Sequence, residues 1–124
     1  PEFLFEAAQS LSKTGQYEKA NEYLERAVLL SSDPMLYYVM AKNEQCLGEY
    51  RQAEKHLLHA IDILPERIYP YYLLMNLYTE PSYFQPAKLK MAIDSVLTKK
   101  PKVESSAIKE MKEKARSMLN NTSI

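Results

Sequence analysis

The chain of 124 residues contains no tryptophan, one cysteine and two glycines. The single cysteine excludes an internal disulfide, and two glycines are too few for the glycine-rich loops that hold phosphate groups. No run of about 18 apolar residues is present, so this segment is not expected to span a membrane. The chain shows no signal peptide and begins at Pro1 without methionine, as expected of a segment excised from a longer protein.

The composition that remains is typical of a soluble globular domain, with 46% hydrophobic and 26% charged residues. The net charge is zero, but the charges are unevenly placed. Residues 1–66 carry 11 acidic and 6 basic side chains, whereas residues 67–124 carry 5 acidic and 10 basic ones. A basic C-terminal half can attract an acidic partner or an anionic membrane surface. The alternative interpretation is that these charges form solvated helix faces, where charged side chains are most common.

The two glycines mark an internal repeat with a period of 33 residues. Each glycine is followed by a tyrosine two positions later and by alanines five and twelve positions later. The two sets are Gly15, Tyr17, Ala20 and Ala27, and then Gly48, Tyr50, Ala53 and Ala60. A period of this size is typical of helical repeat proteins.

Apolar residues recur with helical spacing on either side of each glycine. In the first repeat the pattern predicts helices over 3–14 and 17–30, separated by a glycine that can adopt the left-handed conformation of a helix C-cap. The second repeat has the same pattern, and its expected helices lie over 37–47 and 53–64. Pro65 ends the last of these, because proline lacks the amide hydrogen that a continuing helix needs.

The rest of the chain is less regular. The apolar pattern predicts a third pair of helices over 70–78 and 89–97, and the turn at 79–82 between them has no glycine and is expected to be rebuilt. A single amphipathic helix is then expected over 103–119, with Ser105 or Ser106 as its N-cap.

Paired helices with a glycine turn, two alanines seven residues apart and a closing proline resemble the tetratricopeptide repeat (TPR) family. The residues that carry the resemblance are Leu4, Ala7, Ala8, Leu11, Gly15, Tyr17, Ala20, Leu24 and Ala27 in the first repeat, Tyr37, Met40, Ala41, Gly48, Tyr50, Ala53, Leu57, Ala60 and Pro65 in the second, and Tyr71, Leu74 and Tyr78 in the third. The third repeat departs from the family pattern at Met75 and Ser82.

This resemblance implies an all-α fold, a helix-turn-helix repeat solenoid. Three TPR-like hairpins are expected at 1–33, 34–66 and 67–101. Residues 102–124 are expected to form a C-terminal capping helix and a frayed tail, because a terminal repeat must cover its last hydrophobic face.

A narrower resemblance concerns the third repeat and the segment before the last helix. The sequence from Arg67 to Leu74, with Pro81 downstream and then Lys100 to Ser105, looks like the C-terminal soluble region of bacterial O-antigen-ligase or polymerase-like membrane proteins. Such proteins have a multi-span membrane region that handles lipid-linked glycans, followed by helical repeats. The resemblance implies that a membrane region upstream tethers this segment to the bacterial inner membrane and carries the chemistry.

No motif in the segment itself predicts catalysis, a cofactor or a metal site. His56 and His59 are three residues apart on one expected helix, but no third ligand stands near them in the sequence, so a surface pair is the favoured interpretation over a zinc site. Cys46 has no neighbouring base in the sequence and is read as an inert thiol rather than a nucleophile.

The resemblance also implies a concave groove lined by the first helix of each repeat. The positions that would face this groove are Phe5, Gln9, Tyr38, Lys42, Tyr72 and Asn76, with Tyr69 beside them. Aromatic rings and hydrogen-bonding side chains in parallel rows suit an extended peptide or a sugar. The alternative is that the last helix or another segment covers these residues, since apolar stripes on helices usually belong to the core.

One known ligand class of the family is not expected here. Some TPR domains hold a C-terminal carboxylate with basic and asparagine side chains, but the matching positions read Phe5, Gln9, Val39, Tyr69 and Leu73. Because no basic residue is among them, the sequence predicts that chaperone-type acidic C-termini do not bind.

These observations predict a non-catalytic protein-interaction module with a protein or peptide partner, a glycan being the alternative ligand, and with no nucleic acid partner. The leading interpretation is the soluble C-terminal domain of an O-antigen-ligase-like membrane protein. The alternative is a free-standing TPR adaptor that binds an extended peptide in its groove. A third hypothesis, an enzyme that uses His56, His59 or Cys46, has the least support.

Overall fold

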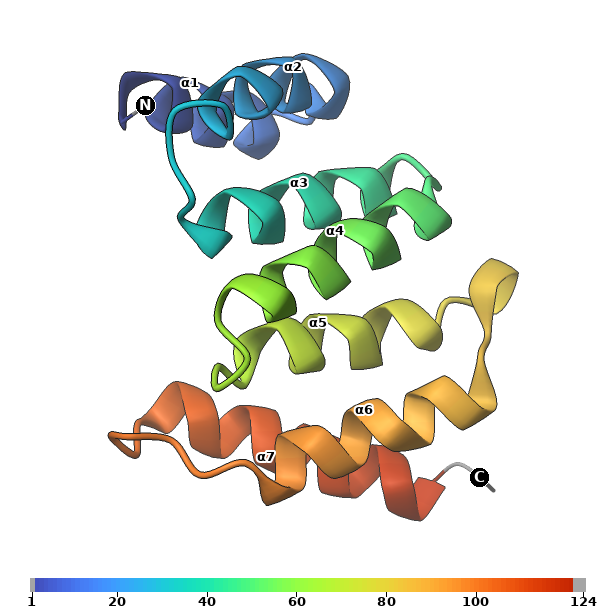
Figure 1. Cartoon of the computed structure of the whole chain (residues 1–124). Coiled ribbons are helices and arrows are strands. Elements are labelled where there is room, and N and C mark those ends of the chain that lie inside the picture. The colour runs from blue at the N-terminus through green and yellow to red at the C-terminus, as the bar shows by residue number, and fades with distance from the viewer. Residues whose placement is uncertain (1, 122–124) are drawn as a thin grey trace. The chain divides into compact units, whose positions relative to one another are not determined.

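The structure, a computed structural model, describes residues 2–121, and within this range the regular elements are all helices (Figure 1). They are α1 (Glu2–Lys13), α2 (Tyr17–Ala27), α3 (Pro34–Cys46), α4 (Tyr50–Ile63), α5 (Tyr69–Tyr78), the short 3₁₀ helix η1 (Pro81–Tyr83), α6 (Pro86–Thr98) and α7 (Ser106–Asn121). The predicted all-α fold is therefore confirmed for the described residues.

The chain divides into two compact units, Pro1–Pro65 and Glu66–Ile124. The first unit holds the hairpins α1/α2 and α3/α4, with α2 also packed against α3. The second unit holds the hairpin α5/α6 and the additional helix α7, which packs mainly against α6 and also touches α5. The boundaries 1–33, 34–66, 67–101 and 102–124 stay predictions, and the end of the expected frayed tail lies outside the described residues.

Both glycines end a helix in the left-handed conformation, as the sequence predicts. Gly15 has φ 81° and Gly48 has φ 77°. After α1, the amide of Gln16 donates to the carbonyl oxygen of Leu11 at 2.9 Å and that of Gly15 donates to Ser12 at 3.1 Å. This pair of hydrogen bonds is a Schellman motif, and the same pattern follows α3.

Replacing Gly48 with alanine is expected to lower the free energy of unfolding by about 1–2 kcal/mol. No atom lies within 4 Å of the Cβ that alanine would add, so the effect is conformational rather than steric. Asparagine tolerates the left-handed region better than alanine, so Gly48→Asn is the control and should lose less stability in urea unfolding. Equal stability of both variants and the parent chain would contradict the assigned helix cap.

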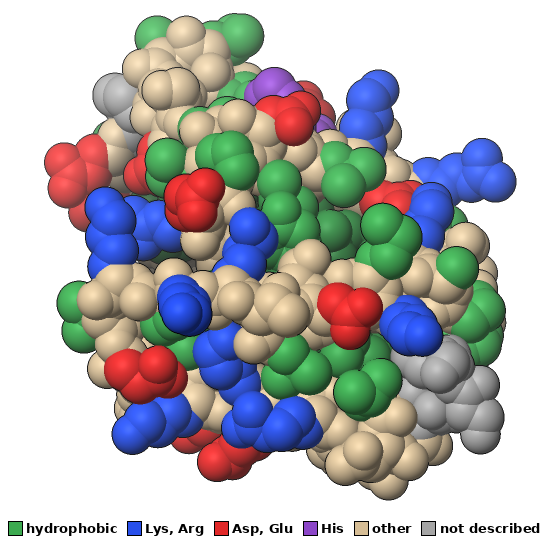
Figure 2. Space-filling model, turned by 60° about the horizontal axis from the view of Figure 1, so that its bottom comes forward, with side chains coloured by type: hydrophobic (Ala, Val, Ile, Leu, Met, Phe, Trp, Pro, Cys, Tyr) green, Lys and Arg blue, Asp and Glu red, His purple; other side chains and the backbone are tan. Residues whose placement is uncertain are grey.

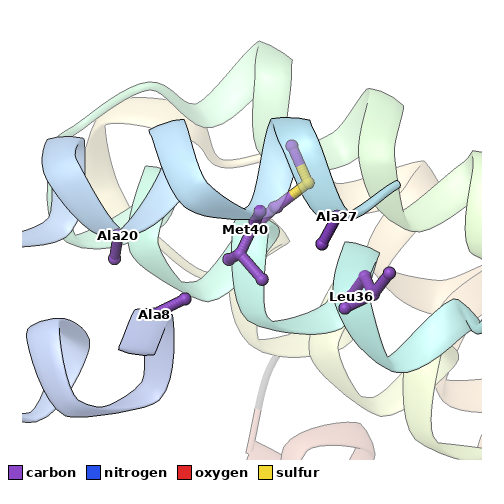
Figure 3. Close-up of a cluster of buried hydrophobic side chains, with 6 residues drawn as sticks. Ala8, Ala20, Ala27, Leu36 and Met40 are labelled. Atoms are coloured by element: carbon purple, nitrogen blue, oxygen red, sulfur yellow. The ribbon is translucent and has the colours of Figure 1, made fainter. Parts of the chain in front are cut away.

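The core of the first unit contains small side chains at the contacts between helices. A cluster of buried residues brings together Ala8 from α1, Ala20, Leu24 and Ala27 from α2, and Leu36 and Met40 from α3. Figure 3 shows the labelled alanines directed into the space that these helices share. Alanine lets two helices approach closely, which is the physical reason for the paired alanines in the repeat.

A buried chain of hydrogen bonds crosses the same three helices. The Ser12 hydroxyl donates to Oδ1 of Asn43 at 2.8 Å, and Nδ2 of Asn43 donates to Oδ1 of Asn21 at 2.8 Å. Nδ2 of Asn21 then donates to the carbonyl oxygen of Met40 at 3.3 Å. Each side-chain amide thus donates to the next polar group, and this chain of hydrogen bonds fixes the positions of α1, α2 and α3 along one another.

The second unit differs from the first at its turn and at its end. In place of a glycine, the α5–α6 connection contains η1, and the amide of Gln85 donates to the carbonyl oxygen of Tyr78 at 3.2 Å. On α7, Ala115 is fully buried. The Lys112 ammonium donates to the carbonyl oxygens of Val96, Leu97 and Lys99 at 2.7, 3.3 and 3.0 Å. Lys112 of α7 therefore donates hydrogen bonds to carbonyl oxygens at the C-terminal end of α6, where a helix has no partners of its own for them.

Five expected helix boundaries were wrong by three residues. The helices expected to begin at residues 37, 53 and 89 begin at Pro34, Tyr50 and Pro86. The second helix ends at Ala27 rather than at residue 30. Beyond it, the amides of Leu29 and Leu30 donate to the carbonyl oxygens of Arg26 and Ala27, which are three residues back instead of the four of an α-helix. The last helix begins at Ser106 rather than at residue 103. Its cap is Ser105, whose hydroxyl oxygen accepts from the amide of Ile108 at 3.2 Å, so the residues before Ser105 lie outside the helix.

Candidate functional site

The predicted groove residues of the first unit fall into two groups. Phe5 is half-buried against the core cluster, and Tyr38 is only 6% exposed. Gln9 and Lys42 are exposed. The polar members therefore reach solvent while the aromatic members lie within the packed structure. No observation tests the groove as a binding site, and its assignment stays a prediction.

The predicted groove residues of the second unit lie together on α5. Tyr69, Tyr72 and Asn76, here called the α5 strip, are each half-buried. The rings of Tyr69 and Tyr72 stack with centroids 6.4 Å apart and an interplanar angle of 22°. Lys114 of α7 places its ammonium 5.5 Å from the centroid of the Tyr72 ring. The α5 strip and Lys114 together thus form a surface of two rings, an amide and a cation.

Asn76 contributes the most informative atom of the α5 strip. Its Oδ1 is buried and has no hydrogen-bond partner among residues 2–121. An acceptor in this state destabilises a protein by about 1–3 kcal/mol unless a donor reaches it. Such an unsatisfied polar group indicates a position where a ligand or water supplies the missing donor.

The two histidines lie beside Tyr37 on the α3/α4 hairpin. The Tyr37 ring contacts His59 edge-on, with centroids 4.6 Å apart, and His56 at 5.8 Å. Nδ1 of His56 lies 2.7 Å from Oε1 of Glu44, and the two side chains are 17% and 6% exposed. A carboxylate this deeply buried needs a hydrogen-bonded partner, so the first role of His56 is to pair with Glu44.

A shallow hollow of about 410 Å³ opens beside the histidines. It is lined by Tyr37, Lys55, His56, Leu58, His59 and Asp62. Within residues 2–121, no group of three or more His, Cys, Asp or Glu side chains is placed to hold a metal ion. The hollow presents groups of both charge signs, so its chemistry selects no single class of ligand.

Cys46 is exposed at the end of α3 and lies beside Tyr17. The pKa of Tyr17 is raised, first by a hydrogen bond between its hydroxyl and Cys46, second by the charge of Cys46, and least by the loss of solvent around the phenol. A phenol with a raised pKa stays protonated at neutral pH and cannot take the thiol proton. Tyr17 therefore does not act as a general base toward Cys46.

The sequence analysis missed four buried polar residues of the described range, namely Asn21, Asn43, Glu44 and Glu54. A signal for Glu44 was present, because it lies four residues after Met40 on a face that otherwise carries apolar side chains. Within residues 2–121, no helix is both long and apolar enough to cross a bilayer.

Comparison with known proteins gives two matches of different kinds. Residues 1–34 match the model of the tetratricopeptide repeat family. Among 19 matching chains of solved structures is the crystal structure of the Sgt2 TPR domain from Aspergillus fumigatus. It superposes with a TM-score of 0.74 at 15% sequence identity, covering 99% of this chain and 83% of that one.

No curated protein sequence matches the chain. The resemblance to O-antigen-ligase-like membrane proteins is therefore not supported by any relative, whereas the TPR resemblance is supported by sequence in the first hairpin and by fold over the whole chain. Residues 1–34 are thus similar to a tetratricopeptide repeat, and the chain has the all-helical fold of a tetratricopeptide repeat domain.

Proposed function

We propose that the chain is a non-catalytic protein-interaction module and that the α5 strip binds an extended peptide segment. The single observation that carries this proposal is the buried Oδ1 of Asn76, which lacks a donor among the described residues. An extended peptide has backbone N–H groups on both edges and can supply that donor once the half-buried side chain of Asn76 turns toward the surface.

The neighbouring side chains suit the same ligand. The stacked rings of Tyr69 and Tyr72 offer a large contact area, and tyrosine loses little conformational entropy when it is held at an interface. The Lys114 ammonium packs on Tyr72 and keeps donors available to a peptide carbonyl or carboxylate. The α5 strip thus provides an acceptor and an apolar surface, and Lys114 beside it provides a cation.

The proposal is tested by screening the chain against arrays of extended peptides and of glycans, followed by titration of the strongest binder. Asn76→Leu removes the acceptor but keeps the side-chain volume, and it should weaken peptide binding at least tenfold, about 1.4 kcal/mol. Tyr72→Ala should weaken it by a similar factor. Gln16→Leu, which changes an exposed amide of the first unit, is the matched control and should bind like the parent chain.

Two results would overturn the proposal. Unchanged affinity of Asn76→Leu and Tyr72→Ala would place binding elsewhere on the chain. A screen in which only glycans bind would replace the peptide with a sugar as the ligand of the rings.

The protein context has two candidates. A domain of an O-antigen-ligase-like membrane protein rests on the narrower sequence resemblance alone, and a free-standing TPR adaptor agrees with the fold match to the Sgt2 TPR domain. The upstream reading frame separates them. Several hydrophobic spans before Pro1 would support tethering to the bacterial inner membrane, and a start codon directly before Pro1 would exclude it.

A further inference from the structure

Three large apolar side chains are exposed at one end of the first hairpin. Phe3, Leu29 and Leu30 have 80%, 82% and 65% of their surface exposed. Their neighbours Leu4 and Val28 both pack against the core cluster of the first unit. The start of α1 and the end of α2 therefore lie side by side, as the antiparallel hairpin in Figure 1 also shows. We call these three residues the head patch.

The head patch lies in an acidic part of the chain. Glu2 and Glu6 flank Phe3 on α1 and are both exposed. Glu25 is exposed one turn before Leu29. Exposed apolar residues scattered singly need no explanation, but a group of three beside three carboxylates and one cation, Arg26, is typical of an interaction surface.

The second unit carries a complementary feature. Val103, in the connection between α6 and α7, is 74% exposed. Lys100 and Lys102 beside it are also exposed, and we call these three residues the tail patch. Figure 2 shows several Lys and Arg side chains, with hydrophobic, Asp and Glu side chains between them, on the face turned to the viewer. The tail patch thus joins an apolar group to positive charge, which the exposed carboxylate of Glu104 offsets in part.

We propose that the head patch of one copy binds the tail patch of a second copy. Charge indicates a second copy as the partner of the head patch, because Glu2 and Glu6 lie around Phe3 whereas Lys100 and Lys102 lie beside Val103. Head-to-head contact would bring carboxylates against carboxylates, and tail-to-tail contact would bring ammonium groups together, and both are disfavoured. The interface is therefore heterologous, and a pair of copies keeps one free head on one copy and one free tail on the other.

A heterologous contact of this kind predicts association that increases with protein concentration, into rings if the contact closes and into chains if it does not. Salt screens exposed charges, so the association constant should fall as NaCl is raised. The measurement is sedimentation equilibrium of the full chain from low to high micromolar concentration, at low salt and at high salt. The average mass should rise above the monomer mass with concentration, and this rise should be smaller at high salt.

Two variants separate the proposed arrangement from a symmetric dimer. Phe3→Asn blocks the head and Val103→Asn blocks the tail, and each should lower the association constant at least tenfold. Both positions are exposed, so folding should be unchanged by circular dichroism. A mixture of the two variants still offers one intact head and one intact tail, and it should form a one-to-one complex that does not grow further. Leu58→Asn, at an exposed site outside both patches, is the control and should associate like the parent chain.

Three outcomes would overturn the inference. The first is a parent chain that stays monomeric over the whole concentration range. The second is a Val103→Asn variant that still dimerises while Phe3→Asn does not, which would indicate a symmetric head-to-head contact. The third is a mixture of the two variants that remains monomeric.

Discussion

Replacing His56 with alanine is expected to lower the free energy of unfolding by about 3 kcal/mol. The change removes the nitrogen that lies 2.7 Å from Oε1 of Glu44, whose side chain is only 6% exposed. A carboxylate left without its partner at this depth regains only part of the hydration that it has in the unfolded chain. The expected loss is therefore much larger than the loss for a surface ion pair, which is about 0–1 kcal/mol.

The double variant Glu44→Leu with His56→Leu separates this cause from a simple loss of contacts. Replacing both members of a buried pair with apolar residues is often neutral or stabilising, so the double variant should lie within about 1 kcal/mol of the parent chain. His59→Ala is a second control, because His59 is exposed and its ring meets that of Tyr37 edge-on. Urea unfolding measures all three. Equal small losses for His56→Ala and His59→Ala would show that the pair with Glu44 contributes no stability.

Removing residues 104–124 is expected to make the chain aggregate and to lower its melting temperature. The deletion takes away α7, whose Ala115 is fully buried, and uncovers the side of α6 on which it packs. It also removes the Lys112 ammonium from three carbonyl oxygens at the end of α6. A repeat unit cannot cover its last hydrophobic face alone, so the exposed face should associate with other copies.

Lys112→Met distinguishes the two contributions of α7. Methionine keeps most of the apolar stem but removes the charged donor, so this variant should lose about 1.5–3 kcal/mol and stay as monomeric as the parent chain. Size-exclusion chromatography and thermal melting are compared at a concentration where the parent chain is monomeric. If the truncated chain remains monomeric and melts at the same temperature as the parent chain, α7 is not a cap.

The positions of the helices could be predicted from the sequence because local chemistry determines them. A glycine that accepts positive φ follows α1 and α3, and Ser105 caps α7, and each of these devices acts within a few residues. The end of α2 was wrong because leucines at 29 and 30 continue an apolar pattern, although neither is covered in the structure.

The polar interactions could not be predicted, because their partners are distant in the sequence. Asn43 meets Asn21 from 22 positions away, and His56 meets Glu44 from 12. Helical spacing places Tyr38 on a face of its helix, but it does not reveal that only 6% of the side chain stays exposed. In the same way, the position of Asn76 could be predicted, whereas the missing partner of its Oδ1 depends on every side chain around it.

The most direct test of the central claim is an NMR titration of the chain with the strongest peptide from the screen. We expect the largest chemical shift changes at the Asn76 side-chain amide and at the rings of Tyr69 and Tyr72, and little change around Tyr37 and His59. Saturable shifts at the α5 strip that disappear in Asn76→Leu are the predicted result. Shifts centred on the first unit, or an Asn76 amide that does not move while the peptide binds, would contradict the account.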